Sequence, residues 1–311
     1  MPEHIPYQGD VELYPPALEA LETTDFDRLV YLEELNPVLL LNFQKHVMKT
    51  LEILVKSSNQ NGQRYKLITG FTGTGKSTLL RAFSEKHPPT DLELAVISRP
   101  VLYLVTPPAA TGHLLCAEIL RQAGVWSPVV RKNENLMPNV ISALRAQNVR
   151  VLIIDEMQHA NLAKAGPMTG AFLDTIKYLG EVLDISIVCG GTYSICAMML
   201  TEDPPLERRF GQPLELPLLE RNKTLPGFVK GVQRAFPLRR HQDLCTDEML
   251  NLIANTANMT PDSVMKLLKA AANWAIETGE ERITTKLIKK IGWQKIPLDT
   301  DTTWVQRHSR A

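Results

Sequence analysis

The segment GFTGTGKS, residues 70–77, has the residue types and spacing of a loop that binds the phosphates of a nucleotide. It matches the pattern G-x-x-x-x-G-K-[ST] in full and lies between a predicted strand and a predicted helix. Glycines allow backbone N–H groups to surround the phosphates, and the amino-terminal end of the helix adds a favourable dipole. We expect a nucleoside triphosphate to be bound by Gly70, Thr72, Gly73, Thr74, Gly75, Lys76, Ser77 and Thr78.

Two side chains of this segment have specific expected roles. The Lys76 ammonium should reach the β and γ phosphates, and the Ser77 hydroxyl should coordinate Mg²⁺. A tight glycine turn that binds no nucleotide is the alternative interpretation, and the strand–loop–helix context argues against it.

A second motif supplies the carboxylates that hydrolysis requires. The apolar run VRVLII, residues 149–154, is a predicted strand that leads into Asp155 and Glu156. Asp155 should hold Mg²⁺ through water, and Glu156 should polarise the attacking water as a general base. Apolar strands that end in acids are common, but Asp155 follows Lys76 by 79 residues with one predicted strand between them. Together the two motifs predict hydrolysis rather than binding alone.

Short apolar runs alternate with helical periodicity through the middle of the chain. Predicted strands cover 65–69, 101–106, 149–154 and 185–189, and predicted helices cover 37–57, 76–87, 111–123, 136–147 and 171–183. This alternation is typical of βαβ units and of a parallel sheet that helices cover on both faces. Beyond about residue 218 only helical spacing remains.

These patterns predict four parts along the chain. Residues 1–36 are an acidic amino-terminal arm, either extended or packed as a loose cap, and residues 37–218 are an α/β nucleotide-binding domain. Residues 219–295 form a helical subdomain, and residues 296–311 are a polar tail.

The charge is balanced over the whole chain but not along it. The 311 residues include 34 Lys and Arg and 34 Asp and Glu. The first 40 residues contain nine acids and one base, a sum of −8, so the remainder carries +8. Overall neutrality therefore does not exclude DNA binding by the body of the protein, and the acidic arm is suited to dock a basic partner.

Several classes of protein are excluded by what the sequence lacks. The first residues have neither the basic nor the apolar region of a signal peptide, and prolines or glycines interrupt both long uncharged stretches. The four cysteines do not have the spacing of a zinc site, which favours buried thiols in a reducing compartment. We expect a cytoplasmic protein with no membrane contact.

From residue 37 to residue 292 the sequence resembles the TniB/TnsC family of AAA+ ATPases, which regulate DNA transposition, including that of CRISPR-associated transposons. The segments that carry the resemblance are VRVLIIDEMQHANL with FLDTIKYLGEVLDISIVCGGT, LERRFGQPLELPLLERN, and AFPLRRHQDL with LLKAAANWAIETGEERIT. The resemblance implies an α/β AAA+ P-loop fold with a parallel five-stranded sheet and a carboxyl-terminal helical lid. It also implies ATP and Mg²⁺ as ligands.

The resemblance extends to individual site residues. Thr192 corresponds to the sensor 1 residue that orients the hydrolytic water, although a Thr after a Gly-Gly turn also suits a helix N-cap. Arg209 corresponds to the arginine finger that reaches the γ-phosphate of a neighbouring subunit, with Arg208 as the competing candidate and an exposed salt bridge as the alternative. No sensor 2 arginine is present. Ser263 lies near its place and Lys266 follows one turn later, so either Lys266 substitutes or sensing from the lid is weak.

Contacts with DNA are implied for the elements after the second predicted strand. Thr111 and His113 lie in or near a Pro-rich loop, and Arg131 and Lys132 lie in a short basic loop. Both loops suit phosphate contacts, and a solvated loop is the alternative.

The resemblance implies a ring or helical homo-oligomer that assembles on duplex DNA with ATP. Such an assembly would link a TniQ-like target-selection protein to the transposase, and its DNA contacts would be directed at the backbone and depend on salt. Two alternatives stay open. One is a helicase-loader or replication-initiator ATPase, and the other is a non-hydrolysing nucleotide switch that acts as a scaffold.

Overall fold

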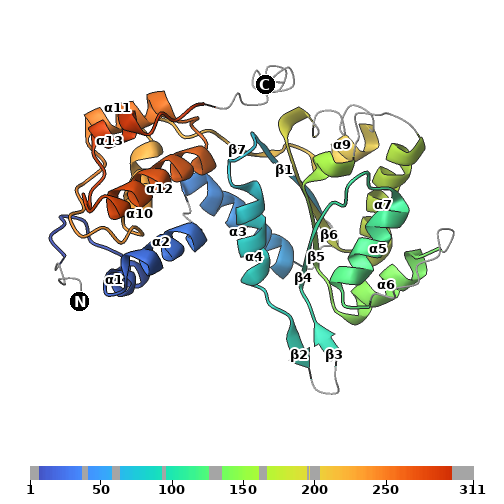
Figure 1. The fold of residues 1–311 in the computed structure, drawn as a ribbon. Helices are drawn as coiled ribbons and strands as arrows, with labels where there is room; N and C mark the ends of the chain where they lie inside the picture. The colour runs from blue at the N-terminus through green and yellow to red at the C-terminus, as the bar shows by residue number, and fades with distance from the viewer. Residues whose placement is uncertain are drawn as a thin grey trace. The chain divides into compact units, whose positions relative to one another are not determined.

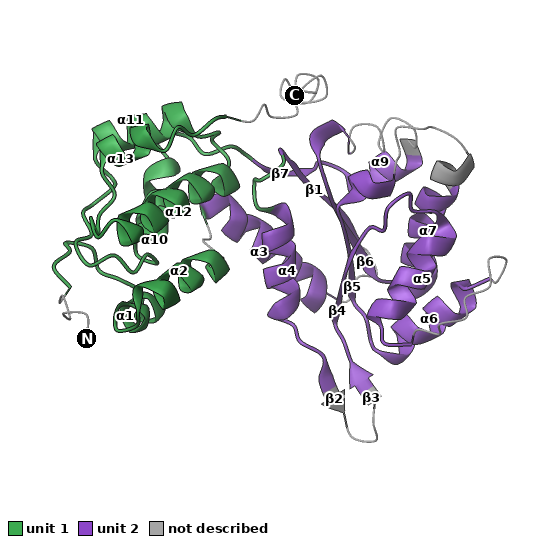
Figure 2. Cartoon of the chain, viewed as in Figure 1, with its two compact units in different colours: residues 1–41, 72–75, 217–299 green, residues 42–71, 76–216, 300–311 purple. Residues whose placement is uncertain are grey.

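The computed structural model describes residues 7–36, 41–57, 64–92, 96–125, 135–160, 167–194, 196 and 204–295. Contacts within the chain divide it into two compact units (Figure 2). Unit 1 comprises residues 1–41, 72–75 and 217–299, and unit 2 comprises residues 42–71, 76–216 and 300–311. The predicted polar tail, 296–311, lies outside the described residues.

Unit 2 is built on a five-stranded sheet in the order β4-β5-β6-β1-β7, and every pair in it is parallel. Its strands are β1 (Tyr65–Gly70), β4 (Val101–Val105), β5 (Val151–Asp155), β6 (Ser186–Gly191) and β7 (Leu214–Leu216). The α/β class and the parallel five-stranded sheet are therefore confirmed.

Three short strands escape the sequence patterns. The strand β7 has three residues, and β2 (Thr90–Leu92) and β3 (Val96–Ser98) form a separate antiparallel pair. Runs of three residues are too short for a period of two to be recognised.

Helices cover both faces of the sheet (Figure 1). The helix α4 (Lys76–Glu85) packs on one face against β1, β5 and β6, and α3 (Asn42–Lys56) packs against α4. On the other face lie α5 (Gly112–Gln122) and α7 (Pro167–Leu183), with α6 (Met137–Ala146) against both. Because both faces are covered, all five residues of β5 are buried: the four apolar residues 151–154, as their pattern predicts, and Asp155 at the end of the strand.

The order of the strands constrains the site. The strand β6 lies between β1 and β5, with Thr69 opposite Gly191 and Ile154 opposite Cys189. The loop after β1 and the acids at the end of β5 are therefore two strand spacings apart, about 10 Å.

Unit 1 is helical in its described residues. Its helices are α1 (Pro15–Leu21), α2 (Asp25–Glu34), α10 (Leu225–Gln233), α11 (Asp247–Thr256), α12 (Pro261–Glu277) and α13 (Thr285–Lys290).

Unit 2 also contains α9 (Pro204–Phe210) and the short 3₁₀ helix η1 (Met157–Ala160).

The amino-terminal segment is not the extended or loosely packed arm that its acidic composition suggested. Leu32 of α2 is fully buried in the core shared with α10 to α13, and α2 packs against α12. The side chain of Glu12 accepts a hydrogen bond from Arg234 at 2.9 Å. Acidic residues dominate the exposed side of these helices, so composition alone conceals their apolar side.

A buried ion pair fixes α2 within unit 1. The guanidinium of Arg28, which is fully buried, donates to both carboxylate oxygens of Glu281 at 2.6 and 2.9 Å. It also donates to Asp25 at 2.7 Å and to the carbonyl of Pro237 at 2.8 Å. Burial alone would raise the pKa of Glu281, but the hydrogen bonds and charges of Arg28 and Arg239 hold that pKa below its usual value.

Among the described residues, no helix is both long and apolar enough to cross a membrane.

The variant Glu281→Gln should lower the free energy of unfolding by about 3 kcal/mol at pH 7, because buried Arg28 then keeps only the exposed carboxylate of Asp25 as a counter-charge. The folded pKa of Glu281 is lowered, so its contribution is present above the unfolded pKa and is lost as the pH falls through the folded value. The difference from wild type should therefore shrink below about pH 4. Urea unfolding followed by circular dichroism, repeated at several pH values, measures this difference in the free energy of unfolding.

The matched control is Glu12→Gln, which removes one carboxylate charge from an exposed pair with Arg234. We expect a loss of less than about 1 kcal/mol. Equal losses for the two variants would contradict the role given to the buried pair.

Candidate nucleotide-binding and hydrolysis site

The predicted phosphate-binding loop joins β1 to α4. Gly70 ends β1, residues 71–75 form the loop, and Lys76 begins α4. Gly73 and Gly75 have φ angles of +81° and +90°, a region that side chains with a Cβ rarely adopt. The glycines of the motif are therefore required by the backbone of this loop.

The Lys76 side chain is enclosed by the loop that precedes it. It is 7 % exposed, and its ammonium donates hydrogen bonds of 2.9 Å to the carbonyls of Gly70 and Phe71. Burial lowers the pKa of Lys76, and the nearby carboxylates of Glu156 and Asp155 oppose that effect. A cation is thus held at the mouth of the loop, where an anionic phosphate would be attracted.

One hydrogen bond joins the two predicted motifs. The Ser77 hydroxyl donates to Oε1 of Glu156 at 2.7 Å, although the residues are 79 positions apart. Ser77 lies in the first turn of α4, and Glu156 directly follows β5. The structure therefore brings together the loop and the carboxylate that the sequence predicts to act on one substrate.

Asp155 is fully buried at the end of β5. Its Oδ1 accepts from the backbone N–H of Glu156 at 2.8 Å, and its Oδ2 accepts from the Tyr103 hydroxyl at 3.0 Å. The Thr106 hydroxyl donates to the Asp155 carbonyl at 2.7 Å. These contacts fix the carboxylate in one orientation.

Gly190 provides the space in which the Asp155 side chain lies. A Cβ at position 190 would be 2.6 Å from Oδ1 of Asp155 and 2.9 Å from Cδ1 of Leu80. The strand β6 lies between β5 and β1, so side chains from β5 and α4 meet over it. Only glycine fits there without displacing one of them.

Sequence patterns missed two residues that position the acids. The Gln158 side-chain amide donates to Oε2 of Glu156, and the Tyr103 hydroxyl contacts Asp155. Glu156 itself has a φ of +56°, an uncommon left-handed conformation that costs about 1–2 kcal/mol. Gln158 follows Glu156 by only two residues, but the sequence does not show that the turn into η1 brings its side-chain amide back to the Glu156 carboxylate.

Thr192 directly follows β6, the neighbour of β5. It is 9 % exposed, and its hydroxyl is 3.1 Å from the Ser194 hydroxyl. Its carbonyl accepts from the N–H of Cys196 at 3.0 Å, so it begins a helical turn. This placement is compatible with both expected roles, and its action on water stays a prediction.

Within unit 1, the loop residue Gly73 contacts the first turn of α12. Its carbonyl accepts from the N–H of Asp262 at 3.1 Å, and a Cβ on Gly73 would lie 3.2 Å from Oγ1 of Thr260. Ser263 accepts from the N–H of Asn258 at 3.1 Å.

Lys266, the candidate substitute for sensor 2, lies on the same helix α12. Its ammonium donates to the Asp262 carboxylate at 2.8 Å, and its side chain is 63 % exposed. Its substitution for the missing arginine stays a prediction.

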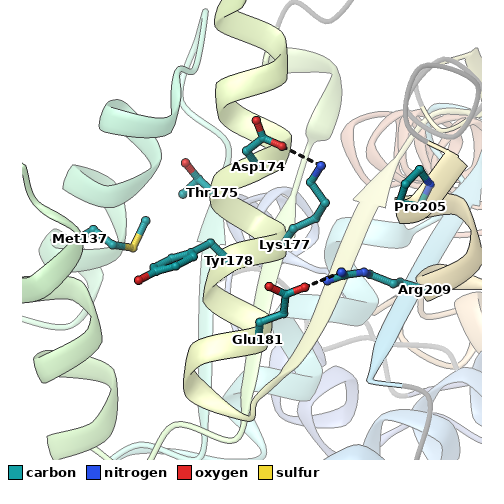
Figure 3. Close-up of a pocket in the computed structure, with 8 residues that line it drawn as sticks. All are labelled: Met137, Asp174, Thr175, Lys177, Tyr178, Glu181, Pro205 and Arg209. Atoms are coloured by element: carbon teal, nitrogen blue, oxygen red, sulfur yellow. Dashed lines mark hydrogen bonds and ion pairs between the residues drawn. The ribbon is translucent and has the colours of Figure 1, made fainter.

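The candidate finger Arg209 lies on α9 in a pocket of unit 2 (Figure 3). The lining residues are Met137, Asp174, Thr175, Lys177, Tyr178, Glu181, Pro205 and Arg209. The Arg209 guanidinium pairs with the Glu181 carboxylate and lies 5.8 Å from the centre of the Tyr65 ring. The hydrogen bond to Glu181 raises the pKa of Arg209, while Arg208 is exposed.

The candidate DNA contacts divide into two groups. Arg131 and Lys132 lie outside the described residues. The Thr111 hydroxyl caps α5 by accepting from the N–H of Leu114 at 3.2 Å. Nε2 of His113 is buried and has no hydrogen-bond partner in the part of the chain that the structure describes. DNA contact at these positions stays a prediction.

The oxygen atoms gathered at the ends of β5 and the loop fit Mg²⁺, which prefers hard oxygen ligands. They belong to Ser77, Asp155 and Glu156, and both Asp155 oxygens already accept hydrogen bonds, which favours contact through water. Among the described residues, no group of three or more His, Cys, Asp and Glu side chains could hold a metal ion. A cation here would therefore depend on phosphate oxygens and water as well.

Comparison with known proteins identifies the family and the fold. The family described as bacterial TniB protein matches residues 40–221. The fold is similar to that of the Aeropyrum pernix ORC1 protein in complex with DNA, at 16 % identity and a TM-score of 0.59, over 85 % of this chain and 68 % of that chain. The A. pernix ORC2 protein in ADPNP–ADP complexes is 19 % identical, with a TM-score of 0.58 over 85 % and 71 %.

A third similar structure is Cdc6p from Pyrobaculum aerophilum, at 16 % identity and a TM-score of 0.56, over 88 % of this chain and 73 % of that chain. At these identities the likeness shows the AAA+ fold alone. No curated protein matches the sequence.

The variant Gly190→Ala should reduce hydrolysis of ATP by about 10²-fold, since a displacement of about 1 Å in a reacting group has that effect. The new methyl group would push against the Asp155 carboxylate and Leu80. Overpacking should also cost about 1–3 kcal/mol of stability. Phosphate release and thermal unfolding measure the two effects, and ATP binding without Mg²⁺ should persist.

The control is Gly227→Ala in α10, where no atom lies within 4 Å of the added Cβ. It should retain full hydrolysis. If Gly190→Ala also kept wild-type hydrolysis, the close packing of Asp155 over β6 would not matter for catalysis.

Proposed function

The chain belongs to the TniB family, and on this premise we propose that it is an ATP-hydrolysing regulator of DNA transposition that assembles on duplex DNA. The observation that carries the proposal is the hydrogen bond between Ser77 of the phosphate-binding loop and Glu156 at the end of β5. This contact supports the assignment of Glu156 as the general base for water that attacks the γ-phosphate.

Each residue of the site has a part in the proposed reaction. The loop and the Lys76 ammonium bind and orient the phosphates, and Glu156 accepts the proton of the attacking water. Gln158 and Tyr103 hold the two acids in place. When bound, Mg²⁺ would be held by Ser77 and, through water, Asp155, and would neutralise charge on the phosphates.

A neighbouring subunit completes the site in this proposal. Arg209 is bound by Glu181 on α7 and lies near Tyr65 on β1, so it is anchored away from the phosphate-binding loop. A guanidinium suits the γ-phosphate because it is always charged and donates a fork of hydrogen bonds. The finger would therefore act on ATP held by the next copy, which couples hydrolysis to assembly.

Duplex DNA and two protein partners complete the proposal. Two proteins of similar fold, from Aeropyrum pernix and from Drosophila, are described with DNA, which supports DNA binding here. Family membership supports contacts with a transposase and a TniQ-like target-selection protein. DNA contacts directed at phosphates should weaken steeply as salt rises.

The variant Glu156→Gln should slow hydrolysis by about 10²–10⁴-fold, since it removes the general base and keeps the side chain's size. ATP-loaded protein should then stay assembled on duplex DNA, which sedimentation with labelled DNA detects. Lys76→Ala should instead lose nucleotide binding. Unchanged turnover in Glu156→Gln would show that the base has been assigned to the wrong residue.

The finger is tested by a pair of variants that break the same ion pair. Arg209→Ala should reduce hydrolysis about 10³-fold and keep the ATP affinity of the monomer. Glu181→Gln removes the partner but not the finger, and its exposed pair is worth less than about 1 kcal/mol, so hydrolysis should persist. Loss of hydrolysis in Arg208→Ala but not in Arg209→Ala would move the role to Arg208.

A further inference from the structure

An apolar and acidic surface on α2 has no part in the nucleotide chemistry. Phe26 and Val30 are 73 % and 40 % exposed, and they lie with Glu33 at positions i, i+4 and i+7. This is the side of α2 opposite the buried Arg28. Phe26 is the most exposed of the large apolar side chains in the described part of the chain, and Val30 lies one turn away from it.

Acidic side chains border these apolar ones. Asp27 and Glu34 are exposed on the same side of α2 as Val30. We call this surface the α2 face, made of Phe26, Asp27, Val30, Glu33 and Glu34. A surface of this composition fits a partner that is basic and carries an apolar pocket.

A surface of the opposite character lies on α3 in unit 2. Lys45, Lys49 and Lys56 share one side of α3 with Ile53, which is 56 % exposed. Glu52 lies on this side too, and its carboxylate is paired with Lys86 and His87. With His46, these residues form the α3 face. The helix α3 buries its other side, including Val47 and Leu51, so the α3 face is turned to solvent.

A groove runs beside the α3 face. Phe43 and Val47 of α3 form one wall, and Pro213 and Leu214, at the start of β7, form the other. His46 lies at the groove and also belongs to the α3 face. Gln212 and Glu215 also line the groove, so its walls are apolar with one amide and one acid. The apolar walls suit the Phe26 ring, and the lysines of the α3 face suit the acids around it.

We propose that the α2 face of one copy of this chain docks on the α3 face of a second copy, with Phe26 in the groove between α3 and β7. The proposal rests on the assembly in the proposed function and names a surface that forms it. The two faces are different parts of the chain, so the contact is heterologous and leaves one free face at each end. Such a contact generates a ring or a filament.

The contributions of the two kinds of side chain differ. An aromatic side chain that enters an apolar pocket is the usual anchor of an interface, and its truncation commonly costs tenfold or more in affinity. The acids of the α2 face and the lysines of the α3 face steer the approach and fix its orientation. Phe26 should therefore control affinity, and the charges should control salt dependence.

The first test is the assembly of the full chain with ATP, Mg²⁺ and duplex DNA, followed by sedimentation velocity. Phe26→Ala should raise the protein concentration needed for assembly about tenfold or more. The control is Ile97→Ala, which truncates another exposed apolar residue, 41 % exposed and on β3, and should assemble like wild type. Wild-type assembly of Phe26→Ala would overturn the proposal.

Charge exchange tests the pairing of the two faces. Glu33→Lys with Glu34→Lys should weaken assembly, and so should Lys45→Glu with Lys49→Glu. A chain that carries all four changes should recover assembly, because opposite charges face each other again. Failure of the fourfold variant to improve on either pair would count against the proposal.

Cross-linking distinguishes contacts between copies from contacts within one chain. One population carries Val30→Cys and another carries Lys49→Cys, and a short bismaleimide is added to the mixture with ATP and DNA. A cross-linked dimer beyond the background of the unsubstituted chain supports the proposal. If only a doubly substituted chain cross-links, and only within itself, the α2 face does not dock on a second copy.

ATP binding by the monomer is measured alongside. If Phe26→Ala binds ATP normally and fails to assemble, both the interface and the proposed function are supported. A chain that binds no ATP but still cross-links would contradict the proposed function and keep the interface. Normal ATP-driven assembly without cross-linked dimers would contradict the interface alone.

Discussion

The site depends on one constraint of the sheet: β6 lies between the strand that carries the phosphate-binding loop and the strand that carries the acids. Asp155 and Glu156 must therefore act across a strand that contributes no side chain of its own at that point. Gly190 makes this possible, because any larger residue would meet the Asp155 carboxylate and Leu80. The Ser77–Glu156 hydrogen bond joins the first turn of α4 to the residue after β5, on opposite sides of β6 in the strand order.

A second constraint acts in unit 1. The Arg28–Glu281 pair joins α2 to the segment before α13, residues that are 253 positions apart. Both terminal nitrogens of Arg28 donate further hydrogen bonds, to the Pro237 carbonyl and to Asp25, which offsets the cost of burying the charge. The acidic amino-terminal helices are thus part of the helical unit, and α2 exposes Phe26 and Val30 on the side opposite Arg28.

Much of the fold follows from the sequence because the signals are long. The longer strands of the central sheet are mostly apolar, and the glycine-rich loop leaves little choice of structure between a strand and a helix. The β7 strand and the β2–β3 pair are too short to predict. The packing of the amino-terminal helices is hidden in the sequence because their acids outnumber the apolar residues that α2 buries.

The candidate site was predictable in its motifs but not in its supporting contacts. Tyr103 and Gln158 reach the acids only through the register of β4 and the turn into η1, and neither is encoded in a local pattern. The role of Gly190 depends on strand order, which composition and periodicity do not determine. Arg209 could be named from the family resemblance, but its ion pair with Glu181 depends on the packing of α9 near α7.

The central claim is that hydrolysis needs two copies of the chain, one that holds ATP and one that supplies the finger. The most direct measurement is the rate of phosphate release per molecule as a function of protein concentration, with and without duplex DNA. The specific rate should rise with concentration, and DNA should shift that rise to lower concentrations. A specific rate that is constant over the whole range, or no release at any concentration, would contradict the account.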